Sequence, residues 1–429
     1  MRILFATEYY HPFTPGGTPW SLQLLVRELT RRGHTVAVVT PSYGAPAREE
    51  VDGIAVFRFR YWRRLPPGPS LAPVRDHANP LFHLLFARAI ARAAREIGAD
   101  VLHAQEKHAL VGTWLAARRL GRPFFLTLRD FGLICPITTC LLSADRIPAD
   151  CGSVKLQRDC APVFLRHYIR GGWLRRLRVR LSLALLYLDA RLKAAVVRRA
   201  DGVIGVSRSI LDIYTSAGRV PRGRGHVVHS LPPAAPAGPP AERTGARARF
   251  GLPEGPLVLY VGKLSLGKGF PVLAETARRV TAHRPGTVFA AVGSGPPAAD
   301  PGPVRLLGSR SHGDVETLYE LADVVVHPAV WPEPFSRVPL EAAAAGRPVV
   351  AARTGGTPEA VEDKETGLLV EPGDAAALAD AVERLLADRP LARALGRRAA
   401  EVVAERFAAD RLVDRLLEVY ARTAAGGAR

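Results

Sequence analysis

Two carboxylates eight residues apart, Glu333 and Glu341, are the side chains whose type and spacing first suggest chemistry in this 429-residue sequence. An apolar run at 322–328 ends in a proline-rich turn before Glu333, and a second apolar run at 348–352 follows Glu341. The pattern predicts strand, loop, helix and strand, with Glu341 about one turn into a helix that begins near Arg337. In open α/β sheets such a loop forms the mouth of a crevice that binds ligands. The ordinary alternative is a pair of solvated glutamates.

The same stretch resembles a known signature. E-x7-E followed by A-x3-G-x-P-V-V is similar to the donor-site signature of retaining glycosyltransferases of family 4, which have the GT-B fold. The match runs in order from Leu257 to Asp374, through VLYVGKLSLGKG, FAAVGSGP, VRLLG, LYELADVVVHP and TGGTPEAVEDKETGLLVEPGD. The N-terminal half matches more loosely. The resemblance implies an α/β protein with two doubly wound, Rossmann-like domains that face each other across a cleft.

The resemblance also implies a donor site for a nucleotide diphosphate sugar, with a UDP- or GDP-sugar favoured. Lys263 and Lys268 match the pair that holds the diphosphate, although Arg is usual at the first position and Lys lacks its bidentate fork. Two solvated lysines are the alternative. Glu341 is expected to bind the ribose hydroxyls, and Glu333 to lie near the sugar. The other expected contacts are the amides of Phe335, Ser336 and Arg337, the glycines Gly17, Gly262 and Gly293, and the main chain of Arg310.

Catalysis is expected to use Glu333, Lys268 and Arg129 and to require no divalent metal. Lysines and helix amides can stabilise a diphosphate leaving group, and no acidic triad or D-x-D pattern stands beside the nucleotide site. The family mechanism is a front-face displacement in which the leaving phosphate helps to deprotonate the acceptor hydroxyl. Many family members carry His where Arg129 stands. Since Arg cannot exchange protons near neutral pH, either the His is dispensable or Arg129 serves as a sugar or phosphate contact, and His103 is the nearest alternative imidazole.

Two other functions stay open beside glycosyl transfer. One is a sugar-nucleotide epimerase with the same fold, against which the E-x7-E block and the K-x4-K pair argue. The other is a non-catalytic sugar-nucleotide-binding partner, which Arg129 motivates. The acceptor stays open between a small natural product, a lipid-linked saccharide and a growing polysaccharide.

All four cysteines fall in one segment: Cys135, Cys140, Cys151 and Cys160. The spacing C-x4-C-x10-C-x8-C lacks a tight C-x2-C and is therefore an imperfect zinc pattern. Such clustering still favours a structural zinc or iron–sulfur site, with disulfides and reduced thiols as the alternatives. By the resemblance, the segment lies beside the acceptor.

The order of predicted elements indicates an N-terminal domain at 1–231 and a C-terminal domain at 241–406. The resemblance implies that the first binds the acceptor and the second the donor. Strands are expected in the first domain at 1–7, 35–40, 54–59, 99–104, 124–128, 202–206 and 227–231, and helices at 18–32, 81–97, 109–119 and 165–199. This alternation predicts a parallel, doubly wound sheet. The sequence PPAAPAGPP at 232–240 predicts a linker. The resemblance implies that the C-terminal helix, 408–429, crosses back to pack on the first domain.

The composition favours two or three well-packed domains, because 48% of the residues are hydrophobic. The formal net charge is +19, yet no basic motif interleaved with aromatic residues occurs, so nucleic acid is not an expected partner. An anionic membrane or a phosphate-rich substrate fits the charge better, and a GC-rich genome is the compositional alternative. The N-terminal MRILFATEYY does not resemble a signal peptide, and no apolar run of about 18 residues occurs, so we expect a cytoplasmic protein.

One helix has a possible second role at a membrane. Residues 174–189 place five leucines on one stripe, with Arg175, Arg176 and Arg180 off it: Leu174, Leu177, Leu181, Leu185 and Leu188. This pattern is typical of a helix that lies on a membrane surface, and it predicts peripheral attachment at the inner face of the plasma membrane. A buried leucine stripe with a solvated arginine face is the equally supported alternative.

Overall fold

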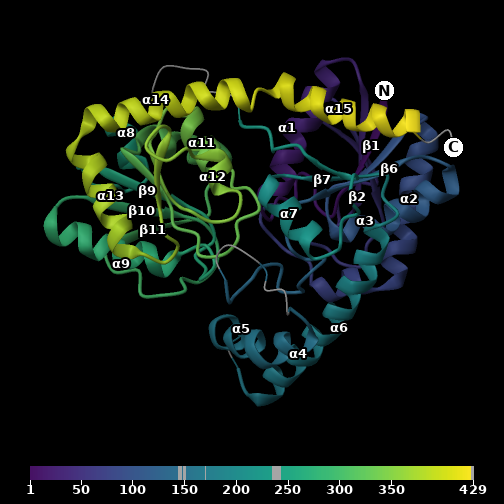
Figure 1. Cartoon of the computed structure of the whole chain (residues 1–429), viewed down its shortest axis with the longest axis horizontal. Coiled ribbons are helices and arrows are strands. Elements are labelled where there is room, and N and C mark those ends of the chain that lie inside the picture. The colour runs from purple at the N-terminus through teal and green to yellow at the C-terminus, as the bar shows by residue number, and fades with distance from the viewer. Residues whose placement is uncertain (144–146, 148–150, 170, 234–242, 427–429) are drawn as a thin grey trace.

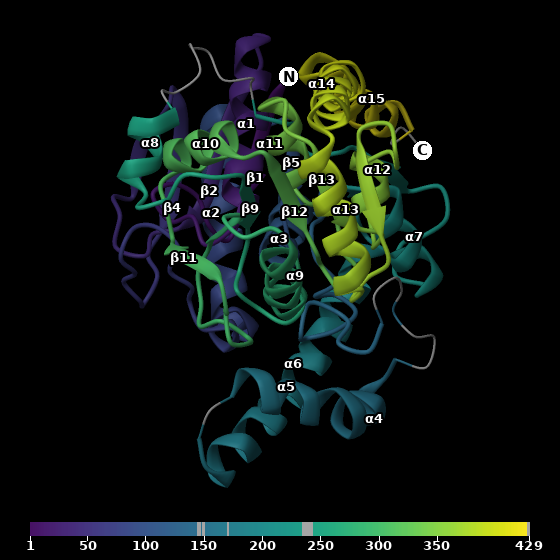
Figure 2. The ribbon, with the colours of Figure 1, turned by 90° about the vertical axis from the view of Figure 1, so that its left-hand side faces the viewer.

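The computed structural model describes residues 1–143, 147, 151–169, 171–233 and 243–426 (Figure 1). Across these residues, an eight-stranded sheet lies in the N-terminal half and a six-stranded sheet in the C-terminal half. Helices pack around both sheets (Figures 1 and 2). This arrangement confirms the predicted α/β class with two Rossmann-like domains. The division that we propose between residues 231 and 241 falls largely in 234–242, outside the described residues.

The first sheet has the strand order β3-β4-β2-β1-β5-β6-β7-β8. Its strands are β1 (Arg2–Ala6), β2 (Thr35–Pro41), β3 (Arg48–Val51), β4 (Ile54–Phe59), β5 (Val101–Ala104), β6 (Phe124–Leu128), β7 (Gly202–Gly205) and β8 (Gly225–Val227). The inner strands are nearly continuous apolar runs because helices cover both faces of a parallel sheet. The edge strand β3 pairs antiparallel with β4, and the sequence analysis missed it because its REEV segment is polar and only half buried.

The second sheet has the order β11-β10-β9-β12-β13-β14. Its strands are β9 (Leu257–Val261), β10 (Val288–Val292), β11 (Val304–Gly308), β12 (Val324–His327), β13 (Val349–Ala352) and β14 (Gly367–Val370). The predicted strand, loop, helix and strand around the two glutamates are confirmed, because α11 (Val338–Ala344) connects β12 to β13.

The remaining helices of the two domains follow the expected alternation with strands. Those of the first domain are α1 (Gly17–Arg31), α2 (Pro80–Ile97), α3 (Lys107–Leu120) and α7 (Arg208–Ser216), with a 3-10 turn at Val74–Ala78. Those of the second are α8 (Arg243–Arg249), α9 (Phe270–His283), α10 (His312–Leu321), α12 (Thr357–Ala360), α13 (Ala375–Ala387) and α14 (Arg389–Arg406).

The last helix, α15 (Ala409–Gly426), continues from α14 and runs along the first domain, so that the C-terminal segment spans both domains (Figure 1). Asp410 and Asp414 pair with Arg32, the C-cap residue of α1, at 2.6 and 2.5 Å. The apolar face of α15 is buried, and the Tyr420 hydroxyl lies against Nδ1 of His103 in β5. The second domain is therefore tied to the first by its own C-terminal helix.

A helical unit projects below both domains (Figures 1 and 2). It contains α4 (Ser153–Lys155), a π-helical turn at Leu156–Cys160, α5 (Ala161–Tyr168) and α6 (Trp173–Val197). The single helix predicted at 165–199 is wrong. The helix ends at Tyr168, Ile169 is extended, and Gly171 adopts a φ of +134°, a left-handed conformation that glycine tolerates. Within the described residues, no helix is both long enough and apolar enough to span a membrane.

Candidate functional site

A cleft with a volume of about 360 Å³ lies between the two domains. Loops after β1 and β6 form one wall, and loops after β9 and β12 form the other. These are carboxyl ends of parallel strands, where α/β sheets bind ligands. The predicted residues that line the cleft are Gly17, Arg129, Gly262, Lys263, Lys268, Glu333, Phe335 and Ser336.

A buried ion pair lies at the centre of the second-domain wall. Lys268 Nζ lies 2.6 Å from Glu333 Oε2, and the Trp331 indole N–H donates to the same oxygen at 2.8 Å. Burial by itself would raise the pKa of Glu333, but the Lys268 charge and these hydrogen bonds outweigh it and hold the pKa below its usual range. Glu333 is therefore an ionised, fully oriented carboxylate at neutral pH.

The second lysine stands beside this pair in the glycine-rich turn after β9. Burial, together with the neighbouring Lys268 charge, lowers the pKa of Lys263. A Cβ atom on Gly293 would lie 1.7 Å from the Gly262 carbonyl oxygen, so only glycine allows the loops after β9 and β10 to cross here. Two ammonium groups thus share one wall of the cleft, as a site for a doubly charged anion requires.

Arg129 reaches the cleft from the first domain. Its guanidinium donates to the Gln105 side chain at 2.7 Å. Burial lowers the pKa of Arg129 to about 10, so the side chain stays charged at neutral pH. The imidazole that lines the cleft is that of His327, at the end of β12, and not that of His103, which is buried between Thr127 and Tyr420. Burial lowers the pKa of His327 to about 4, which keeps its ring neutral.

Several buried polar atoms at the cleft have no hydrogen-bond partner within the described part of the chain. They are Arg129 Nε, Thr139 Oγ1 and His327 Nε2. An unpaired buried polar group costs about 1–3 kcal/mol, so native proteins seldom keep one without a function. Their convergence on one cavity indicates a site built for a polar ligand.

Glu341, Arg337 and Arg310 lie outside this cavity. Glu341 accepts from Arg337 Nε and from the Tyr319 hydroxyl, each at 2.9 Å, and lines a separate pocket of about 20 Å³ beside α10. The Arg310 guanidinium points outward over the Phe250 ring at 5.8 Å. The carboxylate predicted to bind ribose is thus one helical turn behind the cleft wall, and the expected main-chain role of Arg310 stays a prediction.

The domains touch at a seam next to the cleft. Glu359 of α12 accepts from the amides of Arg208 and Ser209 at 2.8 and 2.9 Å, at the N-terminus of α7. Its other hydrogen bond is with His229 at 2.9 Å. Ser207, the N-cap of α7, donates to the Pro334 carbonyl next to Glu333. Domain orientation and the cleft loop are therefore coupled.

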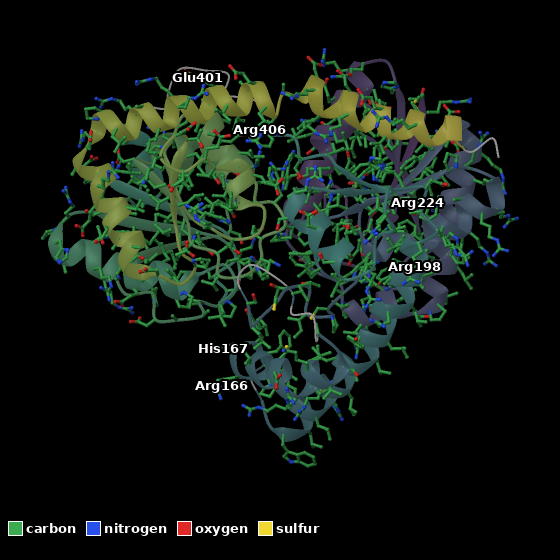
Figure 3. The ribbon with its side chains drawn as sticks, in the orientation of Figure 1. Arg166, His167, Arg198, Arg224, Glu401 and Arg406 are labelled. Atoms are coloured by element: carbon green, nitrogen blue, oxygen red, sulfur yellow. The ribbon has the colours of Figure 1, made fainter. Side chains whose placement is uncertain are left out.

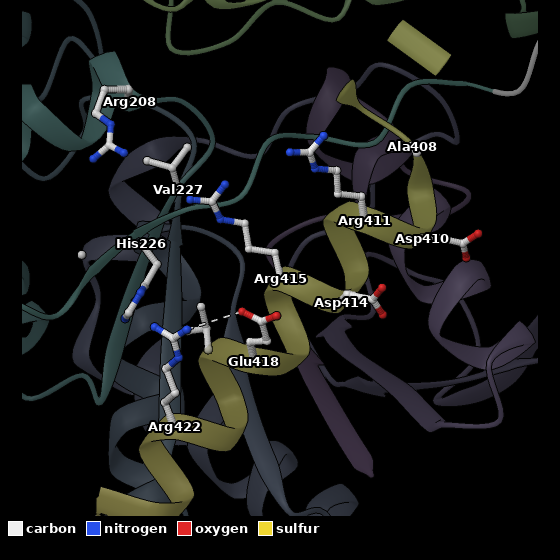
Figure 4. Close-up of a pocket in the computed structure, with 12 residues that line it drawn as sticks. Arg208, His226, Val227, Ala408, Asp410, Arg411, Asp414, Arg415, Glu418 and Arg422 are labelled. Atoms are coloured by element: carbon white, nitrogen blue, oxygen red, sulfur yellow. Dashed lines mark ion pairs between the residues drawn. The ribbon is translucent and has the colours of Figure 1, made fainter. Parts of the chain in front are cut away.

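A larger groove, of about 790 Å³, lies on another face between β8 and α15 (Figure 4). Its wall includes Arg208, Arg411 and Arg415, and an ion pair joins Glu418 to Arg422 at 3.6 Å. None of the predicted site residues lines this groove. We therefore place the chemistry in the smaller interdomain cleft.

Among the cleft residues that the sequence did not predict are Trp331, His327 and Thr139. His327 could have been found, because it ends a strand that points into the expected crevice. Nothing in the local pattern marks Trp331, whose indole meets Glu333 only through the fold of the proline-rich turn.

Comparisons with known proteins bear on both halves of the chain. The family described as Glycosyltransferase Family 4 matches residues 15–231, and Glycosyl transferases group 1 matches residues 243–402. The alpha-D-kanosaminyltransferase of Streptomyces kanamyceticus is 33% identical over 192 residues, which cover 42% of this chain and 49% of that protein. The match therefore spans about half the length of that relative.

Solved structures match the whole chain. Sucrose-phosphate synthase from Thermosynechococcus elongatus has a TM-score of 0.70 at 24% identity and covers 99% of this chain and 100% of its own. HepE of Anabaena, in complex with UDP-glucose, has a TM-score of 0.68 at 20% identity, with 98% and 100% covered. At this level of identity, the likeness shows the fold alone, which is GT-B.

Proposed function

Because the chain belongs to glycosyltransferase family 4, we propose that it transfers a sugar from a nucleotide diphosphate sugar to an acceptor hydroxyl with retention of configuration. The observation that carries the proposal is the convergence of Lys263, Lys268 and Glu333 on one interdomain cleft. Two ammonium groups suit a diphosphate, and an ionised carboxylate suits sugar hydroxyls.

In the proposed reaction, Lys263 and Lys268 neutralise the charge that develops on the leaving diphosphate. The amides of Phe335, Ser336 and Arg337, and the N-terminus of α1 at Gly17, add hydrogen-bond donors. Glu333, fixed by Lys268 and Trp331, orients the sugar. Arg129 contacts sugar or phosphate from the opposite wall. The leaving phosphate accepts the proton of the acceptor hydroxyl, so no side chain acts as nucleophile and no divalent metal is required.

A UDP- or GDP-sugar is the donor that we propose. The presence of UDP-glucose in the HepE structure supports a nucleoside diphosphate sugar of this kind. A thermal-shift screen across UDP-, GDP-, ADP- and dTDP-sugars should give the largest stabilisation with the donor, since a ligand that binds only the folded state raises its stability. The donor should then be incubated with acceptor extract.

Three outcomes separate the candidate functions. A glycosylated acceptor would support glycosyl transfer. An epimerised nucleotide sugar would instead identify the protein as an epimerase. Binding of the nucleotide sugar without turnover would identify it as a non-catalytic binding partner. Turnover should also persist in EDTA. Loss in EDTA that magnesium or manganese restores would overturn the metal-free mechanism, provided that any metal held by the cysteines stays bound.

We further propose that the protein attaches peripherally to an anionic membrane, at the cytoplasmic face of the plasma membrane, through α6. The leucine stripe is not buried. Its members, with Leu192 added at the C-terminal end, are between 46% and 70% exposed, and Trp173 at the start of the helix is 72% exposed. The opposite face of α6 packs inward through Leu183, Ala190 and Ala194. Within one chain, the stripe is therefore not packed against the fold, which supports the proposal.

The stripe has the geometry and charge for a flat, anionic surface. From Leu174 to Leu192 it takes five steps over 18 residues, or 3.6 residues per step, which is the period of a straight helix and not the 3.5 of a coiled coil. Residues 173–197 contain six basic side chains and one acidic side chain, for a net charge of +5. Arg166 and His167 lie on the same projecting unit (Figure 3). Attachment there would bring a lipid-linked acceptor near the cleft.

Liposome flotation tests the attachment. The protein should float with vesicles that contain phosphatidylglycerol, should bind pure phosphatidylcholine weakly, and should detach near 1 M salt, where the Debye length is about 3 Å. The double variant Leu181→Glu/Leu185→Glu should not float, whereas Leu306→Glu, at another exposed leucine in the second domain, should. If the wild type is a dimer that does not float and the double variant is a monomer, the stripe is instead the contact with a second copy of the chain.

A further inference from the structure

The four cysteines of the chain converge on one small cavity, of about 20 Å³, at the base of the projecting unit. Cys135 and Cys160 are buried and Cys140 and Cys151 half-buried, and no disulfide joins any two of these four described residues. The rest of the wall is mainly apolar, with Ile137 and Leu141 among its members. We propose that these cysteines hold a structural metal ion, zinc in the first instance.

The projecting unit has a small core, so an additional cross-link would help to stabilise its fold. The buried cluster that joins it consists of Cys135, Leu156, Cys160, Ala161 and Leu183. This core is small even with the partly buried residues packed against it, Ile137, Phe164, Val179 and Tyr187. Small units of this kind are usually held by disulfides or a metal. Two of its five buried members are themselves cysteines, which places potential ligands at its centre.

The donor set fits zinc or iron. Four thiolates provide a closed tetrahedral site, which suits structural Zn²⁺ or an iron–sulfur centre and does not suit magnesium or calcium. Within the described residues, no three of the sulfurs lie within 4.8 Å of one another. Metal binding would therefore bring the sulfurs closer together than they lie here, around a cavity that is large enough for one small ion.

The site would act on the cleft through one short loop. Thr139 lines both the cysteine cavity and the interdomain cleft, and Thr138 lines the cleft beside it. The Thr138 amide donates to the Cys135 carbonyl at 2.9 Å. An ion held by Cys135 and Cys140 would therefore fix, from both ends, the loop that forms the acceptor side of the cleft. This last step rests on the proposed function, whereas the metal content does not.

A second group of side chains could compete for a metal and must be separated in the test. Glu8, His77 and His108 are buried and have ligand atoms within 4.8 Å of one another. Burial, and after it the positive charges of Lys193 and Lys107, lowers the pKa of His108, and these two nearby charges disfavour a cation there. We therefore do not propose a site at this group.

Elemental analysis of anaerobically purified full-length protein tests the proposal. We expect near one zinc per chain, or iron if the site is a cluster. The double variant Cys135→Ser/Cys160→Ser should fall to background, whereas His108→Ala should keep the full content. Metal that follows His108, or a metal-free wild type whose thiols are all alkylated or all disulfide-bonded by mass spectrometry, would overturn the assignment.

If the double variant does not fold, measurements on the wild type still test whether the cysteines bind the metal. Titration of its thiols with a mercurial should release the metal in step with thiol modification, and cobalt added back should give thiolate charge-transfer absorption. Release without thiol modification, or cobalt spectra without that absorption, would refute cysteine ligation. Both readouts are independent of glycosyl transfer, so failure of the metal site and failure of the proposed function remain distinguishable.

Discussion

At the scale of single residues, the cleft depends on charges that are buried together. Glu333 is only 6% exposed, so it would lose its charge if Lys268 and Trp331 did not hold it. The same arrangement anchors Lys268 2.6 Å from a carboxylate, whereas Lys263 forms no ion pair with any residue that the structure describes. A diphosphate that enters the cleft would add the missing negative charge.

The Glu333 pair should give a pH-dependent contribution to stability. The folded pKa of Glu333 lies below its ordinary value, so the contribution is present above about pH 4.3 and is lost as the pH falls through the folded pKa. Glu333→Gln should cost about 1.5–3 kcal/mol at neutral pH, as for a hydrogen bond to a charged group. Urea unfolding of both proteins at several pH values measures the difference, which should shrink in acid. A difference that stays constant into acid would contradict the charged pair.

Glu341 should contribute to nucleotide binding although it stands behind the cleft wall. We expect Glu341→Ala to weaken binding of the preferred nucleotide by about 1.5–3 kcal/mol for each charge-assisted hydrogen bond lost. Glu320→Ala on the neighbouring α10 is the control. Titration calorimetry gives both affinities. Unchanged affinity in Glu341→Ala would remove Glu341 from the donor site and leave it as the partner of Arg337 and Tyr319.

At the scale of elements, short loops bring the site together. The β12–α11 loop carries Trp331, Glu333 and Ser336, and a Cβ atom on Gly355 would lie 2.1 Å from the Glu333 carbonyl oxygen. The segment that leads to α12 therefore packs directly against the loop that carries Glu333. Because α12 also carries Glu359, movement at the seam with α7 would reach the cleft.

Glu359→Ala should loosen this seam. The variant loses a carboxylate that accepts from two amides at the start of α7, and loss of a helix cap costs about 0.5–2 kcal/mol. Unfolding should show that loss, and small-angle scattering should show a wider range of domain orientations. The exposed Glu365→Ala in the same domain should change neither measurement. Scattering identical to wild type would show that Glu359 does not hold the domains together.

At the scale of the whole molecule, α15 links the two domains, because this helix continues from the second domain and packs on the first. Its buried face contains Leu412, Val413, Leu416, Val419 and Tyr420. Burial of a Leu or Val side chain contributes about 1.5–3 kcal/mol, so the helix accounts for a substantial share of the stability of the first domain.

Removal of residues 408–429 should therefore destabilise the first domain selectively. We expect calorimetry to show its unfolding transition lowered or lost, with the transition of the second domain preserved. Removal of 427–429 alone, which lie outside the described residues, is the matched control. Equal loss of both transitions would show that the two domains unfold as one unit and that α15 does not act on the first domain in particular.

The sequence by itself determined the parallel sheets and predicted many of the residues that line the interdomain cleft. Strand and helix periods, and the turns rich in glycine and proline, are short-range features, so they predicted β12, α11, β13 and the loop that carries Glu333. The lysine pair was visible for the same reason, because both residues belong to one turn. The edge strand β3 and the break before α6 were missed, since a polar edge and a Gly-Gly break carry weak local signals.

Only the tertiary structure decided which side chains meet and which faces are covered. The sequence could not show that Trp331 holds Glu333, or that the four cysteines surround one cavity. It also could not say which side of α6 is buried, because the helix is apolar on two opposite faces and periodicity alone does not rank them. In the folded chain, the face with Leu183 and Ala190 is buried and the leucine stripe is exposed. Burial depends on the elements that pack against a helix, and the sequence of the helix alone does not specify them.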